Sequence, residues 1–320
     1  MIDSSENLWL IGSGPMALAY ASVLKAQNVP FRVIGRGLAS AESFWKTTGI
    51  AVTAGGLDLA LAKMSPPKEA IVAVDINQLA SVTQRLIGAG CKRLLIEKPG
   101  ALNINDLHEI QSKATISGAN VWIAYNRRFY ASVNKLRELV NSEGGIISTV
   151  FDFTEWSHKI CDLHIDKVVM QRWLLSNSSH VLDLVFSFIG LPADDQWQAW
   201  VGGKLDWHPS GSRFNGAGLS TIGIPFSYNA DWEAPGRWGV EISTRKNKYI
   251  LRPLETLQAI PLGSLQIENV PLDDSLDKKF KPGIYLQCQS FLNADDKFLC
   301  SLADQIKAYP LYARIANYKP

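Results

Sequence analysis

A glycine-rich turn between a strand and a helix lies near the start of the chain and limits the possible folds more than any other segment. Residues 8–11 form an apolar run typical of a buried strand, the turn Gly12-Ser13-Gly14-Pro15-Met16-Ala17 follows, and residues 16–25 have helical periodicity. In such a turn the first glycine permits the tight bend, the second lets a pyrophosphate approach the backbone, and the alanine keeps the helix close to the sheet. Phosphate is also attracted by the N–H groups and the dipole of the helix N-terminus. The pattern predicts dinucleotide binding, with a purely structural turn as the alternative, and the candidate binding residues are Gly12, Gly14, Pro15 and Met16.

The first part of the chain alternates between short apolar runs and helical stretches. After the first strand, the further strand candidates are residues 31–34, 50–53, 70–74, 93–96 and 121–125. Helical periodicity covers residues 76–87 and 105–117, and Asn103 or Asn105 can cap the second of these. Such alternation predicts a parallel sheet with helices on both faces. We therefore expect an α/β protein whose residues 1–125 form a dinucleotide-binding Rossmann domain.

The pattern changes afterwards, and residues 126–320 are expected to form a second α/β domain with a large, mostly antiparallel, open sheet that binds substrate and forms oligomers. Its strand candidates are the longer alternating runs at residues 146–153, 198–205, 219–228 and 238–244. Its helical stretches are residues 178–189 and 285–307. Eight of the ten tryptophans follow residue 120. They pack within the fold, line a substrate pocket or form a subunit interface.

Composition excludes several classes of protein. The chain has 320 residues, of which 47% are hydrophobic and 19% are charged, so disorder and a membrane span are not expected. A net charge of +2 gives no broad basic surface for nucleic acid or an anionic membrane. Residues 1–6 are acidic overall and carry no targeting signal, which favours a cytoplasmic location. The four cysteines, at positions 91, 161, 288 and 300, have no metal-binding or redox spacing, so we expect reduced and mostly buried thiols.

The residues after the second strand bear on the choice of cofactor. An NAD site places an acidic residue there, about 20 residues after the glycine turn, to hold the ribose hydroxyls. Here the chain reads Ile34-Gly35-Arg36-Gly37, and the first carboxylate is Glu42. The guanidinium of Arg36 can pair with a 2′-phosphate, with help from Ser40 or Lys46, whereas a carboxylate would repel it. This favours NADP, with NAD as the alternative if Arg36 is simply solvated.

A lysine follows another buried strand directly. The segment Ile96-Glu97-Lys98-Pro99 ends the run at residues 93–96, because proline fixes its own backbone angle and removes a donor from the sheet. Lys98 is therefore carried to the carboxyl end of a strand, where open α/β sheets bind their ligands.

Two further segments carry candidate groups. Tyr125-Asn126-Arg127-Arg128-Phe129 follows the last strand of the first domain, and its arginines either bind an anionic substrate group or tie the domains together. His180 opens a helix behind a polar run and can exchange a proton near neutral pH, or it is a structural, hydrogen-bonded histidine. His108 falls on a helix that is expected to be solvated, the other three histidines have no useful partner spacing, and no metal site is expected.

In this order and spacing, the glycine turn, Glu97-Lys98-Pro99, the segment 125–129 and the helix that begins at His180 resemble the Gfo/Idh/MocA family of glucose-fructose oxidoreductase and inositol dehydrogenase relatives. The resemblance extends from residue 8 to about residue 190. It implies a Rossmann domain followed by an open-sheet domain that in relatives often packs against another subunit, so a homo-oligomer, a dimer or tetramer, is expected. It also implies hydride transfer between a nicotinamide cofactor and a hydroxyl or keto carbon, commonly on a sugar or a nucleotide-linked sugar.

The resemblance also implies roles for residues. Lys98 would lie beside the nicotinamide and the reacting oxygen, where it would polarise that oxygen or relay its proton, and family members often have a cis peptide bond before the proline. Lys98 and His180 are then the candidate catalytic residues, and Arg36, Glu97 and Lys98 join the candidate cofactor-binding residues. The candidate substrate-binding residues are Tyr125, Arg127, Trp173, Asn177 and His180.

One position departs from the family pattern. The family often has an aspartate four residues before the histidine, where this chain has Ser176. Either His180 acts without that carboxylate, or Lys98 alone transfers the proton, or the chemistry has been lost. Asp183, one turn beyond His180, could orient the histidine or face solvent. The alternatives to a sugar oxidoreductase are a non-catalytic dinucleotide sensor or interaction protein, and a reductase of a non-sugar ligand such as an imine or a tetrapyrrole.

Overall fold

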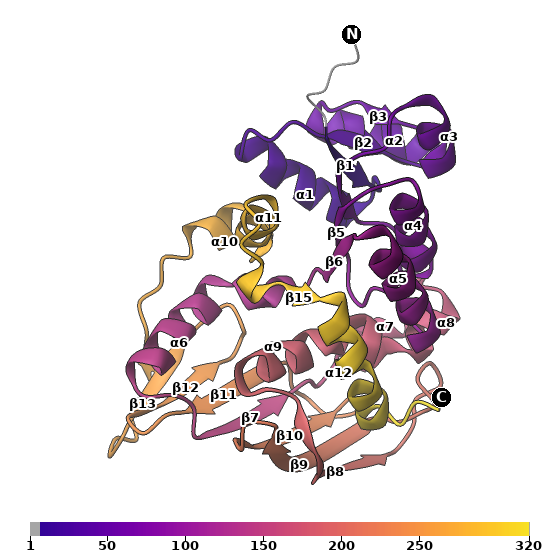
Figure 1. Ribbon diagram of the computed structural model, residues 1–320. Coiled ribbons are helices and arrows are strands. Elements are labelled where there is room, and N and C mark those ends of the chain that lie inside the picture. Colours follow the sequence, from indigo (N-terminus) through magenta and orange to yellow (C-terminus); the bar gives the residue numbers. More distant parts are fainter. Residues whose placement is uncertain (1–6, 320) are drawn as a thin grey trace. The chain divides into compact units, whose positions relative to one another are not determined.

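The computed structural model describes residues 7–319, and the chain divides into two compact units (Figure 1). Unit 1 contains Met1–Tyr125 and Lys279–Ile306, and unit 2 contains Asn126–Lys278 and Lys307–Pro320. Unit 1 thus includes a late segment that the sequence-based division assigned to the second domain. The acidic residues 1–6, which contributed to the expectation of a cytoplasmic location, lie outside the described residues.

Unit 1 contains a seven-stranded sheet in the order β15-β6-β5-β4-β1-β2-β3. Its strands are β1 (Leu8–Ile11), β2 (Arg32–Ile34), β3 (Val52–Thr53), β4 (Glu69–Val72), β5 (Arg93–Ile96), β6 (Asn120–Ile123) and β15 (Cys300–Ser301). The first six are parallel, and β15 joins β6 in the antiparallel direction. This is the 3-2-1-4-5-6 order of a Rossmann fold, in which the chain reverses direction across the sheet between β1 and β4. The α/β fold expected from the sequence is confirmed.

The helices of unit 1 connect these strands. They are α1 (Pro15–Ala26), α2 (Leu38–Thr48), α3 (Gly56–Lys63), α4 (Ile76–Gly88), α5 (Ile104–Ser117), α11 (Ile284–Leu292) and the short η3 (Asp296–Phe298). Of the two proposed caps of α5, the structure uses Asn103, whose side chain accepts a hydrogen bond from the Asp106 N–H. Helices α2 and α3 were not among the helical stretches named from the sequence. Each buries only two residues, so neither has a strong apolar stripe.

Unit 2 contains an eight-stranded sheet in the order β14-β13-β12-β11-β7-β10-β9-β8. Its strands are β7 (Ser148–Asp152), β8 (Pro192–Gly202), β9 (Arg213–Ser220), β10 (Pro225–Asp231), β11 (Gly239–Ser243), β12 (Asn247–Leu251), β13 (Gln258–Pro261) and β14 (Glu268–Asn269). Neighbouring strands are antiparallel except β7 and β10, which are parallel. The expectation of a large, mostly antiparallel sheet is confirmed.

Helices cover one face of this sheet. The helical elements that begin in unit 2 are η1 (Asn126–Phe129), α6 (Ala131–Ser142), α7 (Ser157–Ile160), α8 (Lys167–Gln171), η2 (Leu174–Ser178), α9 (Ser179–Ile189) and α10 (Ser275–Lys279). Helix α12 (Leu302–Ile315) begins in unit 1 and ends in unit 2. The ring of Phe186 on α9 packs edge-on against Phe151 of β7 and Phe226 of β10, at centroid distances of 5.9 and 5.6 Å. Such edge-to-face contacts fasten α9 to the middle of the sheet.

Two expectations from sequence periodicity are wrong. Residues 219–228 do not form one strand, because β9 ends at Ser220 and a turn, closed by a 2.8 Å hydrogen bond from the Gly223 N–H to the Ser220 carbonyl, leads into β10. Residues 285–307 do not form one helix either. Helix α11 ends at Leu292, Ala294 adopts a positive φ of 54°, and the chain passes through β15 before α12 begins. In both places, short local turns interrupt an otherwise continuous apolar pattern.

The other face of the unit 2 sheet is open. Val150 of β7, Trp200 of β8 and Leu219 of β9 lie on it, and these residues are 46%, 58% and 37% exposed. Trp197, Trp232 and Trp238 are instead buried within the unit. The tryptophans of this unit therefore include buried ones and one, Trp200, on the exposed sheet face.

Three of the four cysteines are buried and Cys161 is exposed, and all four are free thiols, as expected from their spacing. No helix within residues 7–319 has the length and apolar character needed to cross a membrane.

Candidate functional site

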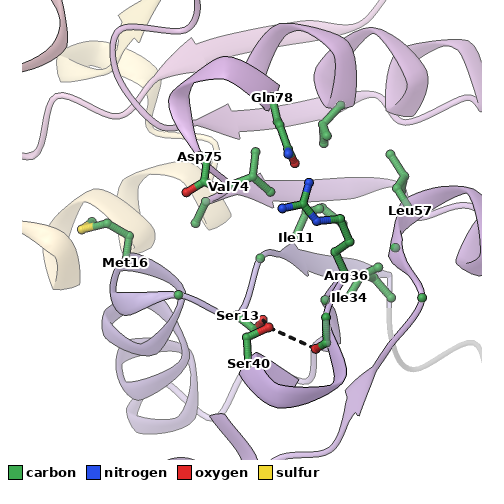
Figure 2. A pocket seen from close by; sticks show the side chains of 18 of the residues that line it. Ile11, Ser13, Met16, Ile34, Arg36, Ser40, Leu57, Val74, Asp75 and Gln78 are labelled. Atoms are coloured by element: carbon green, nitrogen blue, oxygen red, sulfur yellow. Dashed lines mark hydrogen bonds between the residues drawn. The ribbon is translucent and has the colours of Figure 1, made fainter. Parts of the chain in front are cut away.

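A pocket of about 900 Å³ lies at the carboxyl ends of β1, β2 and β4 in unit 1 (Figure 2). Its walls come from the glycine turn, from residues 34–37 after β2, from residues 55–58 at the start of α3 and from residues 73–75 after β4. The volume falls within the range of small-molecule and cofactor sites, and the position is the one where open α/β sheets bind ligands.

The two glycines of the turn have different physical roles. Gly12 has a φ of +121°, and a Cβ there would overlap the carbonyl group of Ala73, so only glycine fits. Gly14 has an ordinary φ of −88°, and a Cβ there would meet nothing within 4 Å. A side chain at Gly14 is therefore compatible with the fold but would project into open space. Ala17 is fully buried and allows close packing of α1 on the sheet. These are the features that a pyrophosphate-binding turn requires.

Arg36 extends from the end of β2 into the pocket and points toward Gln78 (Figure 2). Its side chain is exposed, and no carboxylate among residues 7–319 forms an ion pair with it. In the same pocket, the hydroxyl groups of Ser13 and Ser40 are joined by a 3.0 Å hydrogen bond, and Ser40 also donates to the carbonyl of Gly37. A cation and two hydroxyl groups thus line one pocket.

The other charged residues in or near the pocket differ in whether they form ion pairs. Arg85 forms an ion pair with Asp58, so its charge is compensated within the wall. Asp75, which precedes α4, is exposed, and its side chain does not cap that helix. Lys46 does not line the pocket and pairs with Glu42 on the surface of α2. Of the two residues suggested as helpers of Arg36, only Ser40 lies in the pocket.

Lys98 occupies a tight turn at the carboxyl end of β5, next to the strand that supplies residues 73–75. The Lys98–Pro99 peptide is cis, as the resemblance implies, and the Gly100 N–H donates to the Glu97 carbonyl at 3.0 Å. A four-residue turn with a cis proline at its third position is a type VI turn. The turn is anchored on its other side by the Gln305 side chain, which donates to the Pro99 carbonyl at 3.1 Å.

A buried hydrogen-bonded pair, Tyr20 and Glu97, supports the turn that carries Lys98. The hydroxyl of Tyr20 on α1 donates to Oε1 of Glu97 at 2.7 Å, and both side chains are buried. Burial, followed by the charge of Glu97, raises the pKa of Tyr20 well above its usual value, so the hydroxyl keeps its proton and remains a donor. Glu97 therefore has a structural partner within unit 1, in addition to any contact with a cofactor.

In unit 2, His180 is buried and pairs with an arginine. Nη1 of Arg127 lies 2.7 Å from Nε2 of His180 and also donates to Asn126 at 2.8 Å. Because an arginine N–H can only donate, Nε2 of His180 accepts, and the ring is neutral with its proton on Nδ1. The ring of Trp238 lies beside both groups, 6.1 Å from the His180 ring and 5.4 Å from Cζ of Arg127.

The neighbouring charges have defined partners. Arg128 donates from Nε and Nη2 to the two oxygens of Asp183, at 2.8 and 2.6 Å. Asp183 is buried, so it does not face solvent, and this two-point pair fixes η1 against α9 within unit 2. The pair joins two elements of unit 2, so this contact of Arg128 does not tie the domains together, and its role within the unit is structural.

The residues before His180 form a π-helical turn, η2. Ser176, at the position of the family's aspartate, is buried and directs its hydroxyl to the carbonyls of Trp173 and Val169. Asn177 instead donates to Glu155 at 2.8 Å, and Trp173 is buried with its ring edge-on to Trp207. The Ser176 hydroxyl thus donates to backbone carbonyls of its own segment, and it presents no carboxylate to His180.

Sequence reasoning missed Glu155, Arg237 and Trp238. Glu155 is buried and receives a 2.6 Å hydrogen bond from Arg237 besides the one from Asn177. It also borders a second pocket of about 540 Å³, which lies wholly within unit 2 and includes Trp156 and Trp232. The available signal was the position of the Glu155 carboxylate, two residues after the predicted strand at 146–153. Among residues 7–319, no group of three or more His, Cys, Asp and Glu side chains could hold a metal ion.

Solved structures with the same fold include several dehydrogenases. UDP-N-acetylglucosamine 3-dehydrogenase GnnA from Acidithiobacillus ferrooxidans matches with a TM-score of 0.75 and 15% identity, covering 97% of this chain and 96% of that chain. Levoglucosan dehydrogenase in complex with NADH matches with a TM-score of 0.77 and 15% identity, covering 98% and 96%. The WlbA dehydrogenase from Chromobacterium violaceum, in complex with NADH and UDP-GlcNAcA, matches with a TM-score of 0.72 and 14% identity, covering 99% and 94%. No family model matches the sequence, and a search of the curated proteins found no match. At this identity the likeness shows a common fold over nearly the whole chain.

Proposed function

We propose that this chain is an NAD(P)-dependent oxidoreductase of the Gfo/Idh/MocA type, which transfers a hydride between the nicotinamide and a hydroxyl- or keto-bearing carbon of a sugar or nucleotide-linked sugar. The observation that carries the proposal is the combination, in unit 1, of a pyrophosphate-compatible glycine turn with a lysine held at the end of β5. Two of the neighbours described above are sugar or sugar-nucleotide dehydrogenases by name, and the third is a dehydrogenase in complex with UDP-GlcNAcA, which supports this substrate class.

The residues of the unit 1 pocket fit a dinucleotide. The open space in front of Gly14 leaves room for a pyrophosphate, and the N-terminus of α1 offers N–H groups that have no partner within the helix. Pro15 and Met16 would border the same phosphates, since both line the pocket. A bound nicotinamide would donate or accept the hydride.

We propose NADP rather than NAD as the cofactor. This choice rests on Arg36, which lines the same pocket as Ser13 and Ser40 and pairs with no carboxylate within residues 7–319. A 2′-phosphate would supply the missing anion, and the planar guanidinium fits its oxygens. Two of the neighbours contain NADH, so NAD is the alternative cofactor. A binding measurement must distinguish NAD from NADP.

Lys98 and His180 would transfer the proton to or from the reacting oxygen of the substrate. During reduction the substrate carbon gains a hydride and its oxygen gains a proton, and the reverse reaction removes both. The cis turn and the Tyr20–Glu97 pair hold the backbone that carries Lys98, which would donate or accept the proton on the reacting oxygen. His180 is neutral, and a substrate oxygen that replaced Arg127 at Nε2 would meet a proton acceptor. Tyr125, Arg127, Trp173 and Asn177 remain candidate substrate contacts.

An exposed apolar sheet face supports the proposal of a homo-oligomer, a dimer or tetramer. Val150, Trp200 and Leu219 share the open face of the unit 2 sheet, and exposed apolar patches of this kind mark interfaces. Light scattering on a size-exclusion column tests this, because Trp200→Glu would convert a dimer or tetramer into smaller species. A cytoplasmic location is a further proposal, which rests on the free cysteines and the sequence.

Turnover on a substrate panel tests the proposed activity. Purified protein is mixed with reduced and oxidised NADP or NAD and with a panel of sugars, sugar acids, cyclitols and sugar nucleotides, and the nicotinamide absorbance is followed. The expected result is turnover by the wild type, and cofactor binding without turnover by Lys98→Met. Cofactor binding with no turnover on any compound would favour a dinucleotide sensor, and full turnover by Lys98→Met would refute the role of Lys98.

A further inference from the structure

Arg237 lies at the centre of a cluster of aromatic and polar side chains in unit 2. Its Cζ is 4.5 Å from the ring centre of Trp238 and 5.1 Å from that of Trp156. Trp238 also lies against Arg127 and His180, so the cluster is continuous with the candidate proton-transfer residue. Cation–π contacts of this kind hold a guanidinium in a fixed plane.

A buried carboxylate anchors Arg237 from behind. The Glu155 side chain is 1% exposed, and its Oε2 accepts a 2.6 Å hydrogen bond from Nη1 of Arg237. Its Oε1 accepts from the Asn177 amide at 2.8 Å and from the Ser178 hydroxyl at 2.7 Å. Both oxygens of Glu155 are therefore satisfied within the protein. The carboxylate is available to orient Arg237 and the residues before His180, and it is too deeply buried to contact solvent.

The Arg237 side chain is only partly buried. The side chain is 42% exposed, and its Nε and Nη2 groups have no hydrogen-bond acceptor within residues 7–319. These two groups form the planar fork that binds carboxylate or phosphate at two points. Glu155 therefore fixes one side of the guanidinium and leaves the other side available to a ligand.

A second cation nearby lacks a counter-ion. Arg127 pairs with no carboxylate in the described part of the chain, since Nη1 is bound to the neutral groups of Asn126 and His180. Its Nε is buried and has no acceptor among the same residues. With His180 neutral, the cluster holds two guanidinium cations and one carboxylate. Partly buried positive charge without a partner is costly, and a bound anion would remove that cost.

We infer that this cluster binds a carboxylate or phosphate group of the substrate, with Arg237 as its main contact. The inference rests on the proposed function, and it narrows the substrate class to sugars that carry an acidic group. Arg237 would then be a specificity residue, Glu155 a positioning residue, and Arg127 a second source of positive charge. A neutral sugar would leave both guanidinium groups unmatched and would bind more weakly.

Binding of small acidic probes tests the inference without requiring turnover. The cofactor-loaded protein is titrated with D-glucuronate, glucose 1-phosphate and glucose, and binding is followed by calorimetry and by the fluorescence of the tryptophans. At least one of the two acidic probes should bind about 10-fold or more tightly than glucose, and Arg237→Gln should weaken that binding on the order of 10- to 100-fold. Which acidic probe binds identifies the group as a carboxylate or a phosphate.

Arg245→Gln is the matched control, because Arg245 is an exposed arginine in the same unit and has no partner among the described residues. Its variant should bind like the wild type. Arg237→Lys keeps the charge without the fork, so it should restore more of the binding of a phosphate than of a carboxylate. Thermal unfolding of each variant shows whether the fold is kept, and the lysine variant remains informative if the glutamine variant is unstable.

The outcomes separate this inference from the proposed function. Equal binding of glucose and the acidic probes, no binding of either acidic probe, or unchanged binding by Arg237→Gln would overturn the inference. Turnover on neutral sugars that Arg237→Gln does not affect would also overturn it while leaving the oxidoreductase proposal intact. Acidic binding that depends on Arg237, without hydride transfer to or from any compound, would support the site and refute the proposed reaction.

Discussion

The hydroxyl of Tyr20 donates a 2.7 Å hydrogen bond to the carboxylate of Glu97, the residue directly before Lys98. The two residues are 77 positions apart in the chain, and the bond ties α1 to the turn that follows β5. The same helix begins at the glycine turn, so one element of unit 1 contacts both the glycine-turn side of the pocket and the residue before Lys98.

Removal of the Tyr20 hydroxyl should destabilise unit 1. In Tyr20→Phe, Glu97 loses a buried hydrogen-bond donor, and we expect the free energy of unfolding to fall by about 1–3 kcal/mol in urea denaturation. Tyr285→Phe is the control, because Tyr285 is half-buried and its hydroxyl makes no hydrogen bond with residues 7–319. An equal loss of stability in the two variants would contradict the role of the pair.

Gly14→Val should separate cofactor binding from folding. The new side chain meets open space in the protein, so the melting temperature should stay close to that of the wild type. It would occupy the space in front of α1, so the dissociation constant for NADP or NAD should rise by about 10-fold or more. Gly88→Ala, also at a position with open space, should leave the cofactor affinity unchanged. Unchanged cofactor affinity in Gly14→Val would show that the dinucleotide does not bind at this turn.

Arg36→Gln should weaken NADP and spare NAD. Loss of a charge-assisted pair with the 2′-phosphate predicts an affinity for NADP that is lower by about 10- to 100-fold, measured by quenching of protein fluorescence. NAD has no phosphate there, so its affinity should change little, and Arg245→Gln should leave both unchanged. Tighter binding of NAD than of NADP by the wild type would refute the role of Arg36.

The burial of His208 predicts that the stability of the folded protein depends on pH in the acidic range. It is fully buried, its Nδ1 lies 2.7 Å from the Gly211 carbonyl, and its Nε2 lies 2.8 Å from the Tyr318 hydroxyl. Burial lowers the pKa of His208 from 6.5 to about 4. The unfolded chain therefore takes up a proton at a higher pH than the folded protein does. The free energy of unfolding should fall as the pH drops from 6.5 toward 4, by up to about 3 kcal/mol from this group.

His208→Gln tests that assignment by urea denaturation across the same pH range. The variant should lose a large part of the pH dependence that the wild type shows, whereas His108→Gln should keep it, because His108 is exposed on α5. The same dependence on pH in His208→Gln and the wild type would show that other groups cause it.

The sheet of unit 1 could be predicted from the sequence because its signals are local. Each parallel strand is a short apolar run, and Gly12 and Pro99 mark the turns at which two of them end. Arg36 and Lys98 could be placed at strand ends for the same reason. The strands at residues 219–228 were joined in error, because Ile222 and Ile224 continue the apolar pattern through the turn at Gly223.

The cluster in unit 2 could not be predicted because its contacts are long-range. Glu155 and Arg237 are 82 positions apart, and Arg127 and His180 are 53 apart. Which of several carboxylates meets which arginine depends on strand order in the sheet, which periodicity does not reveal. The sequence identified Ser176 as a missing aspartate, but only the structure shows a different carboxylate, Glu155, bonded to Asn177 and Ser178.

Transfer of a labelled hydride tests the central claim most directly. The wild-type protein is supplied with NADPH or NADH that carries deuterium at C4 of the nicotinamide, together with keto forms of neutral and acidic sugars and sugar nucleotides, and the products are analysed by mass spectrometry. The account predicts one deuterium on the reduced carbon of a sugar product, formed by the wild type and not by Lys98→Met. Tight binding of the labelled cofactor with no deuterium in any sugar would contradict it.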